Sequence, residues 1–127
     1  MSVKVELGEV RDQVAACRSH AYLLTVTDDG RPHAVSLQVA WDGDTLVGGA
    51  GRRTAANAER SPEVSLLWPL SGRDGFALIV DGTAEVRPAG DGDGGGATVA
   101  VKPTAAVLHK TPDGQGDEPG CVKVLGH

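Results

Sequence analysis

The sequence predicts a mainly β protein of 127 residues, folded as one domain covering 1–127 and built as a small barrel or sandwich. Three observations predict this class. Strand-like alternation dominates the chain, Asp/Gly-rich turn signals join the strand patterns, and only two short stretches have helical spacing. A domain of this length buries roughly two-thirds of its unfolded surface, so folding requires no disulfide or metal.

The first elements are a helix and a buried strand. Residues 9–20 predict a helix, because Val10, Val14 and Cys17 recur at helical spacing. Residues 21–26 predict a strand that ends at the turn signal Asp28-Asp29-Gly30.

The next two strands continue an antiparallel meander. Residues 33–41 alternate, which predicts one face with Val35, Leu37, Val39 and Trp41 and another with Ala34, Ser36, Gln38 and Ala40. A turn at 42–44 then leads into a strand at 45–47.

The second half of the chain predicts one more helix and further strands. Residues 54–60 are helical in pattern and stop at Ser61-Pro62. Strands are expected at 64–68 and at 98–102 and 105–110, the last two interrupted at Pro103. Residues 76–80 and 83–87 predict either one long strand or a bent pair around Asp81-Gly82. Composition predicts flexible loops near 90–96 and 111–120, followed by a strand at 121–125.

Charge and composition exclude several classes of function. A net charge of -5, a pI near 5.2 and 3% aromatic residues argue against nucleic-acid and anionic-membrane binding. The sequence has no apolar run of membrane-spanning length and no signal-peptide core. Its two cysteines form no CxxC pair, and its four histidines are not spaced as metal ligands. We therefore expect a cytoplasmic protein with reduced thiols and no metal site.

The stretch from Gly48 to Pro62 has the strongest chemical character in the sequence. Glycines precede the pair Arg52-Arg53, and a short helix begins directly after them. Helix-start amides, the positive end of the helix dipole and guanidinium groups together suit a phosphate. The alternative is that both arginines are solvated charges at a loop.

The order of motifs from about Tyr22 to Val86 resembles the flavin-binding split barrels related to pyridoxamine 5'-phosphate oxidase. The resemblance rests on the segments 29–33, 41–46, 51–54 with Asn57, and 61–66. It implies a six-stranded antiparallel split β-barrel with one or two short helices. It also implies a homodimer with flavin mononucleotide (FMN) in a groove at the subunit interface.

The resemblance also implies the cofactor-binding residues. Arg53 matches a family arginine at the flavin phosphate, and its candidate neighbours there are Gly51, Arg52, Thr54 and Asn57. The second strand would line the flavin ring, through His33, Val35, Ser36 and Leu37. The polar face of that strand could equally be its solvent side. Many family members have lysine where this sequence has Thr54, so the charge of that lysine is missing here.

The implied activity is transfer of hydride from a reduced nicotinamide through FMN to a small acceptor. No general acid–base pair is evident, and catalytic residues stay unassigned. That absence suits a flavin enzyme, because the cofactor supplies the redox chemistry. Three alternatives stay open: a non-catalytic protein that binds flavin, haem or another planar ligand, a deazaflavin-dependent reductase, and a protein without a cofactor. The chain lacks the C-terminal arginine and histidine motif of true pyridoxamine phosphate oxidases, so the namesake activity is not expected.

Overall fold

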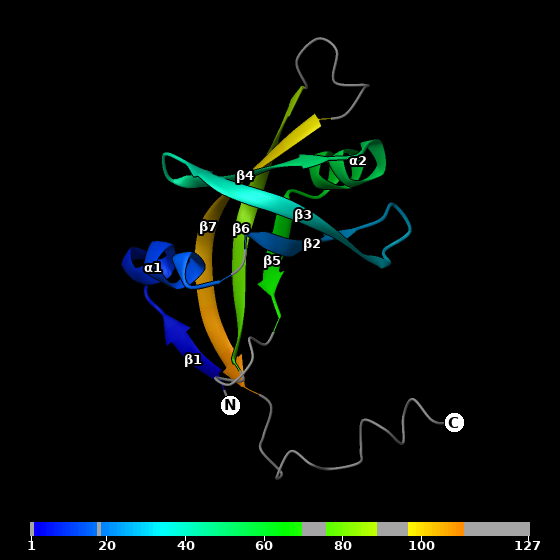
Figure 1. Ribbon diagram of the computed structural model, residues 1–127. Coiled ribbons are helices and arrows are strands. Elements are labelled where there is room, and N and C mark those ends of the chain that lie inside the picture. The colour runs from blue at the N-terminus through cyan, green and yellow to red at the C-terminus, as the bar shows by residue number, and fades with distance from the viewer. Residues whose placement is uncertain (1, 18, 70–75, 89–96, 111–127) are drawn as a thin grey trace, which may run out of the picture.

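A computed structural model describes residues 2–17, 19–69, 76–88 and 97–110, and it confirms the predicted antiparallel barrel (Figure 1). Within these residues, six strands close in the order β7-β4-β3-β2-β5-β6, and β6 pairs back onto β7. All pairings are antiparallel. The strands are β2 (His20–Val26), β3 (Pro32–Asp42), β4 (Thr45–Ala50), β5 (Glu63–Trp68), β6 (Phe76–Pro88) and β7 (Ala97–Lys110).

A further strand, β1 (Ser2–Val5), was not expected from the sequence. It pairs with the second half of β7, from Val5 opposite Ala106 to Ser2 opposite His109. The segment is four residues long, and Val5 is its one buried side chain. Val3 and Val5 alternate with Lys4, but four residues are too few for this pattern alone to define a strand, so its pairing with β7 determines its conformation.

Two short α-helices flank the barrel on opposite sides (Figure 1). The 3-10 turn η1 (Leu7–Glu9) leads into α1 (Val10–Ala15), and α2 (Arg52–Arg60) follows β4. The prediction of a helix at 9–20 is wrong at its C-terminal end, because α1 ends at Ala15. The backbone N–H of Val39 donates to the carbonyl of Ser19, and His20 already belongs to β2. Strand pairing thus overrides the helical pattern, although Val10, Val14 and Cys17 do face the core.

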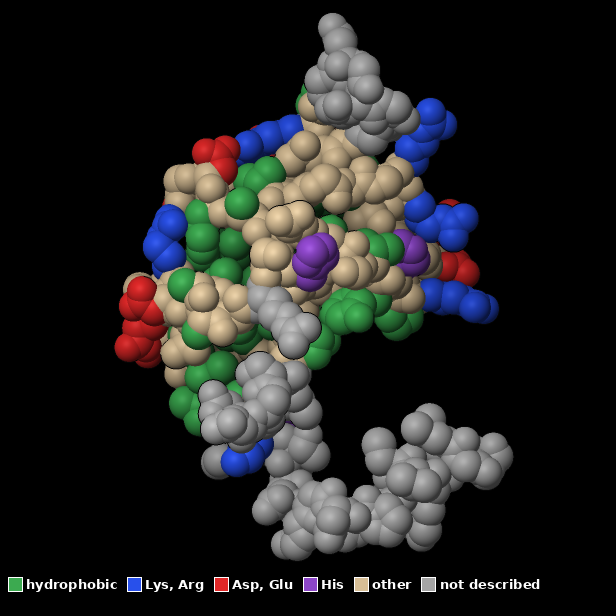
Figure 2. All heavy atoms as spheres, in the orientation of Figure 1, with side chains coloured by type: hydrophobic (Ala, Val, Ile, Leu, Met, Phe, Trp, Pro, Cys, Tyr) green, Lys and Arg blue, Asp and Glu red, His purple; other side chains and the backbone are tan. Residues whose placement is uncertain are grey.

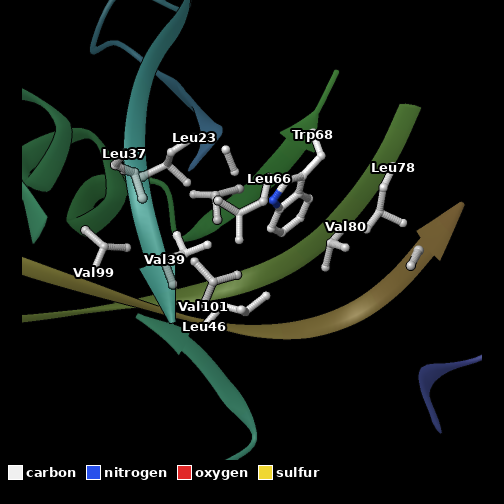
Figure 3. Close-up of a cluster of buried hydrophobic side chains, with 14 of the residues drawn as sticks. Leu23, Leu37, Val39, Leu46, Leu66, Trp68, Leu78, Val80, Val99 and Val101 are labelled. Carbon is white, nitrogen blue, oxygen red and sulfur yellow. The ribbon is translucent and has the colours of Figure 1, made fainter. Parts of the chain in front are cut away.

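The core fills the inside of the barrel with alternate side chains from its strands (Figure 3). The alternation predicted for residues 33–41 is confirmed. Leu37 and Val39 are buried, and Val35 and Trp41 pack partly against the core. Ala34, Ser36, Gln38 and Ala40 are exposed on the outer face. Trp68 is 2% exposed and is the largest fully buried side chain.

Strand β6 runs through Asp81-Gly82 as one long strand, which is one of the two predicted possibilities. Strand β7 is continuous through Pro103, where the sequence indicated an interruption. The ladder shifts register here, so that Gly82 lies opposite Pro103 while Asp81 lies opposite Ala105. A Cβ on Gly82 would lie 2.6 Å from the carbonyl oxygen of Lys102, so only glycine permits this approach. Pro103 also falls between the parts of β7 that pair with β4 and with β1, where its missing N–H breaks no ladder bond.

The expected loops at 90–96 and 111–120 and the expected strand at 121–125 lie outside the described residues. In the part of the chain that the structure does describe, no helix has the length and apolar character needed to cross a membrane.

Candidate functional site

The barrel is split where β3 and β4 separate. These strands pair from Asp42 opposite Thr45 to Val39 opposite Gly48. Beyond Gly48, β4 pairs with β7 alone, up to Ala50 opposite Ala97. Along 33–38, β3 therefore has no strand on its β4 side among the described residues. An unpaired strand edge presents N–H and C=O groups in alternation, which suits a heteroaromatic ring that has donors and acceptors of its own.

Helix α2 begins at Arg52, four residues after Gly48. Its N-cap, Gly51, has no side-chain capping bond, and its first turn contains no acidic residue. The first N–H groups of a helix have no partner within the helix, so the amides of Arg52, Arg53 and Thr54 are available to an anion. Both arginine side chains are exposed, and neither forms an ion pair or hydrogen bond with any of the described residues.

An open cavity of about 730 Å³ lies along the outer face of β3, next to the split. Its lining includes Ser36, Gln38 and Ala40 from β3, His20 from β2 and Gly49 from β4. Apart from His20, these residues have small or neutral side chains. A volume of this size is within the range of small-molecule and cofactor sites.

Asn57 has a structural role that the sequence did not indicate. It is 4% exposed, and its Nδ2 donates to Oγ1 of buried Thr25 over 3.1 Å. Its Oδ1 accepts from Arg60 at 2.9 Å, and the same guanidinium nitrogen lies 3.2 Å from the carbonyl oxygen of Val26. The Asn57 amide thus holds α2 against β2. Thr54 is buried as well, at 3% exposure.

The ring-lining residues predicted on β3 divide between two faces. Ser36 is exposed on the cavity side, whereas the Leu37 side chain lies in the core and Val35 packs against it. His33 is half-buried opposite Thr25, and its Nδ1 is buried without a hydrogen-bond partner among the described residues. Leu37 can therefore contribute backbone groups to the cavity and Ser36 its hydroxyl, whereas Val35 and His33 are not part of the cavity lining.

The strand edge suits the ring of a planar cofactor, and the helix start suits a phosphate tail. Of the residues predicted to bind the cofactor, Ser36 and Leu37 line the cavity, whereas the start of α2 is not part of its lining. Two guanidinium groups and uncapped helix amides match the phosphate, and the unpaired edge matches the ring. Sequence reasoning missed His20, which it assigned to a helix, and the β3 edge, because strand separation leaves no mark in one strand's own pattern. Among the described residues, no group of three or more His, Cys, Asp or Glu side chains is placed to hold a metal ion.

The structure thus defines a split-barrel protein with a cavity beside the point where β3 and β4 separate. The pyridoxamine 5'-phosphate oxidase family model matches residues 8–118. The chain belongs to this family. It is also 39% identical over 114 residues to the uncharacterized protein Mb0449c of Mycobacterium bovis, with 80% of each chain covered.

Solved structures share the fold at lower identity. An FAD-binding protein from Mesorhizobium loti matches with a TM-score of 0.64 and 16% identity, over 85% of this chain and 96% of its own. An F420 reductase matches with a TM-score of 0.59 and 22% identity, over 68% and 87%. A heme binding protein from Mycobacterium smegmatis matches with a TM-score of 0.64 and 18% identity, over 87% and 56%. Neighbours of this one fold thus differ in the cofactors that their names give.

Proposed function

We propose that this protein is a cytoplasmic, homodimeric, FMN-binding oxidoreductase. The observation that carries the proposal is the uncapped, acid-free start of α2, with Arg52 and Arg53 both unpaired within the described residues, beside the open edge of β3. Bound FMN would supply the redox chemistry, accepting hydride from a reduced nicotinamide and passing it to a small acceptor.

The residues of the chain bind and orient this cofactor. The side chains of Arg52 and Arg53 neutralise the phosphate, and the backbone amides from Arg52 to Thr54 donate to its oxygens. The Thr54 side chain is buried, so its contribution is the backbone amide. Backbone groups of β3 fix the ring, and the small side chain of Ser36 lets the ring approach the strand.

A second copy of the chain completes the site by covering the outer face of β2 and β3. This face carries Tyr22 at 42% exposure and Val26 at 39%. Figure 2 shows that Lys, Arg, Asp and Glu side chains lie mainly around the edge of the visible face, with a histidine near its middle. A face with few charged side chains at its centre and a charged rim is typical of a protein interface, and the partner would shield the ring from water.

A carrier that binds a planar ligand without catalysis is the second candidate function. The absence of a cation at Thr54 favours this carrier function, because one positive charge fewer would then surround the phosphate than in many family members. The named FAD, F420 and heme proteins of this fold support a wider choice of ligand, including a deazaflavin or haem.

Flavin titration tests the proposal directly. The fluorescence of FMN should fall when the protein binds it. Arg53→Gln and Arg52→Gln should each weaken the affinity for FMN about tenfold, as for loss of a charge-assisted hydrogen bond. Lys4→Gln is the matched control, because it removes one exposed positive charge from β1, far from α2 (Figure 1). Equal affinity in all four proteins would refute the phosphate site.

Turnover separates the two functions. Steady-state oxidation of NADH or NADPH by the FMN-loaded protein, in the presence of small quinone or aldehyde acceptors, supports the oxidoreductase. Tight FMN binding without turnover supports the carrier. Haem or deazaflavin binding with no FMN binding, followed by absorbance, rejects FMN as the cofactor.

A further inference from the structure

A second cleft lies between the N-terminal helical segment and the barrel wall. It has a volume of about 390 Å³, and Leu7, Val10, Trp41 and Pro103 supply its apolar lining. Arg11 and Lys102 bring positive charge to the same cleft. It adjoins η1 and α1, whereas the proposed flavin phosphate site is at α2, on the other side of the barrel (Figure 1).

The indole of Trp41 has an unused hydrogen-bond donor in this region. Its Nε1 is buried and has no acceptor among the described residues. A buried donor without an acceptor costs about 1–3 kcal/mol, so protein structures rarely leave one without a reason. Nε1 is closed to solvent in this structure, so an oxygen acceptor would remove this cost only after a side chain beside the indole moves.

Arg11 lies directly against the same ring. The centre of its guanidinium is 4.3 Å from the centroid of the Trp41 ring, and Nη2 donates to the carbonyl of Gly43. A guanidinium has five N–H donors, so most of them stay available for a ligand. Because the guanidinium lies over the Trp41 ring, its remaining N–H donors are close to the unpaired indole N–H.

Lys102 adds a second cation with a weak existing partner. Its Nζ is 3.8 Å from a carboxylate oxygen of Asp44, and both side chains are more than 60% exposed. A long ion pair at such an exposed position contributes little to stability, so a ligand carboxylate can replace Asp44 at low cost.

From these groups we propose that the cleft is a binding site for a small aromatic carboxylate, separate from the flavin site. The aromatic ring packs among Leu7, Val10 and Pro103. One carboxylate oxygen accepts the Trp41 N–H, and the other pairs with Arg11, whose guanidinium shifts off the indole face to reach it. Lys102 adds charge at the rim.

Nitrogen-edited NMR of the full-length protein tests this site with benzoate as the probe. The chain has two tryptophans, and Trp41→Phe assigns their indole signals. Benzoate should shift the Trp41 indole proton downfield and saturably, while the Trp68 signal stays in place. Benzylamine, which has the same ring and the opposite charge, should leave both signals unchanged.

Charge variants provide the second arm of the experiment. Arg11→Gln should weaken benzoate binding about tenfold, and Lys102→Gln about threefold. Lys4→Gln should have no effect, because it removes a charge outside the cleft. Arg53→Gln should also leave benzoate affinity unchanged while it weakens FMN binding, so the two proposals fail independently.

Three results would overturn the inference. One is a Trp41 signal that does not move, and another is a shift that stays linear with benzoate concentration. The third is an affinity for benzylamine equal to that for benzoate, or an affinity for benzoate that Arg11→Gln leaves unchanged. Each would mean that Arg11 only clamps α1 to the β3–β4 turn.

Discussion

Gly48→Ala should damage the barrel at the last rung that β3 and β4 share. A Cβ at this position would lie 2.5 Å from Cδ1 of Leu37, 2.8 Å from the carbonyl oxygen of Gln38 and 3.3 Å from Cγ1 of Val39. Leu37 can rotate its side chain. The carbonyl belongs to the backbone of β3, so relief there requires the two strands to move apart.

The cost follows from two opposing terms. Overpacking a well-filled site destabilises by about 1–3 kcal/mol. Replacing glycine by alanine restricts the unfolded chain and returns about 0.4–1 kcal/mol. Since the nearest immovable atom is backbone, we take the upper part of the first range and expect a net loss of about 2 kcal/mol. For a domain of this size that lowers Tm by roughly 8 °C.

Gly49→Ala is the matched control, because a Cβ there meets nothing within 4 Å. Thermal unfolding followed by circular dichroism should show Gly49→Ala within about 2 °C of the parent protein, as for an unstrained exposed site. If Gly48→Ala unfolds at the same temperature as Gly49→Ala, the close approach of β3 and β4 does not constrain residue 48 and the reasoning is wrong.

Four further outcomes follow from the same geometry. Gly49→Ala should weaken FMN binding without loss of stability, because Gly49 lines the cavity beside β3; unchanged affinity in a fluorescence titration would place the ring elsewhere. Val39→Asp should unfold the domain in urea titrations, because a carboxylate at this buried position has no partner, whereas Gln38→Asp on the outer face should fold; equal stability would reverse the face assignment. Asn57→Ala should cost about 1–3 kcal/mol by chemical denaturation, because it leaves Thr25 unpaired in a buried position, and exposed Glu59→Ala in the same helix should cost far less. Burial raises the pKa of the Cys17 thiol, so in a Cys121→Ser background alkylation by iodoacetamide at pH 8 should be slow until urea is added; fast reaction in the native protein would contradict this burial.

The local patterns predicted which residues face the core, because alternation is a property of a single strand. Residues 33–41 show this best, since every predicted inward position is buried or partly buried. Patterns failed where a distant segment decides the structure. Cys17 fits a helix, yet the chain must leave α1 early so that Ser19 can accept from Val39. Pro103 resembles a strand end, yet Gly82 opposite it makes room for a continuous ladder.

The candidate site shows the same division. The sequence alone located Arg52 and Arg53 at a helix start, because capping and charge are local signals. The family resemblance offered Asn57 as a supporting candidate near the phosphate, and in the structure the amide of this residue bonds to Thr25 and Arg60. The side chain of a short polar residue on a helix can face a ligand or a neighbouring strand. Only the packing of α2 against β2 decides between them.

One divergence of the backbone creates both halves of the candidate site. From Leu46 to Gly48, β4 pairs with β3 on one side and with β7 on the other. Beyond Gly48 it keeps only β7, which opens the edge of β3, and three residues later Gly51 caps α2. The proposed ring-binding edge and the proposed phosphate-binding helix start are therefore joined by only a few residues of chain. A variant that moves β4 should consequently weaken binding of FMN and of its phosphate-free analogue riboflavin alike, whereas Arg53→Gln should weaken FMN binding alone. Equal loss of both ligands in Arg53→Gln would show that the arginine supports the fold of the segment and not the phosphate.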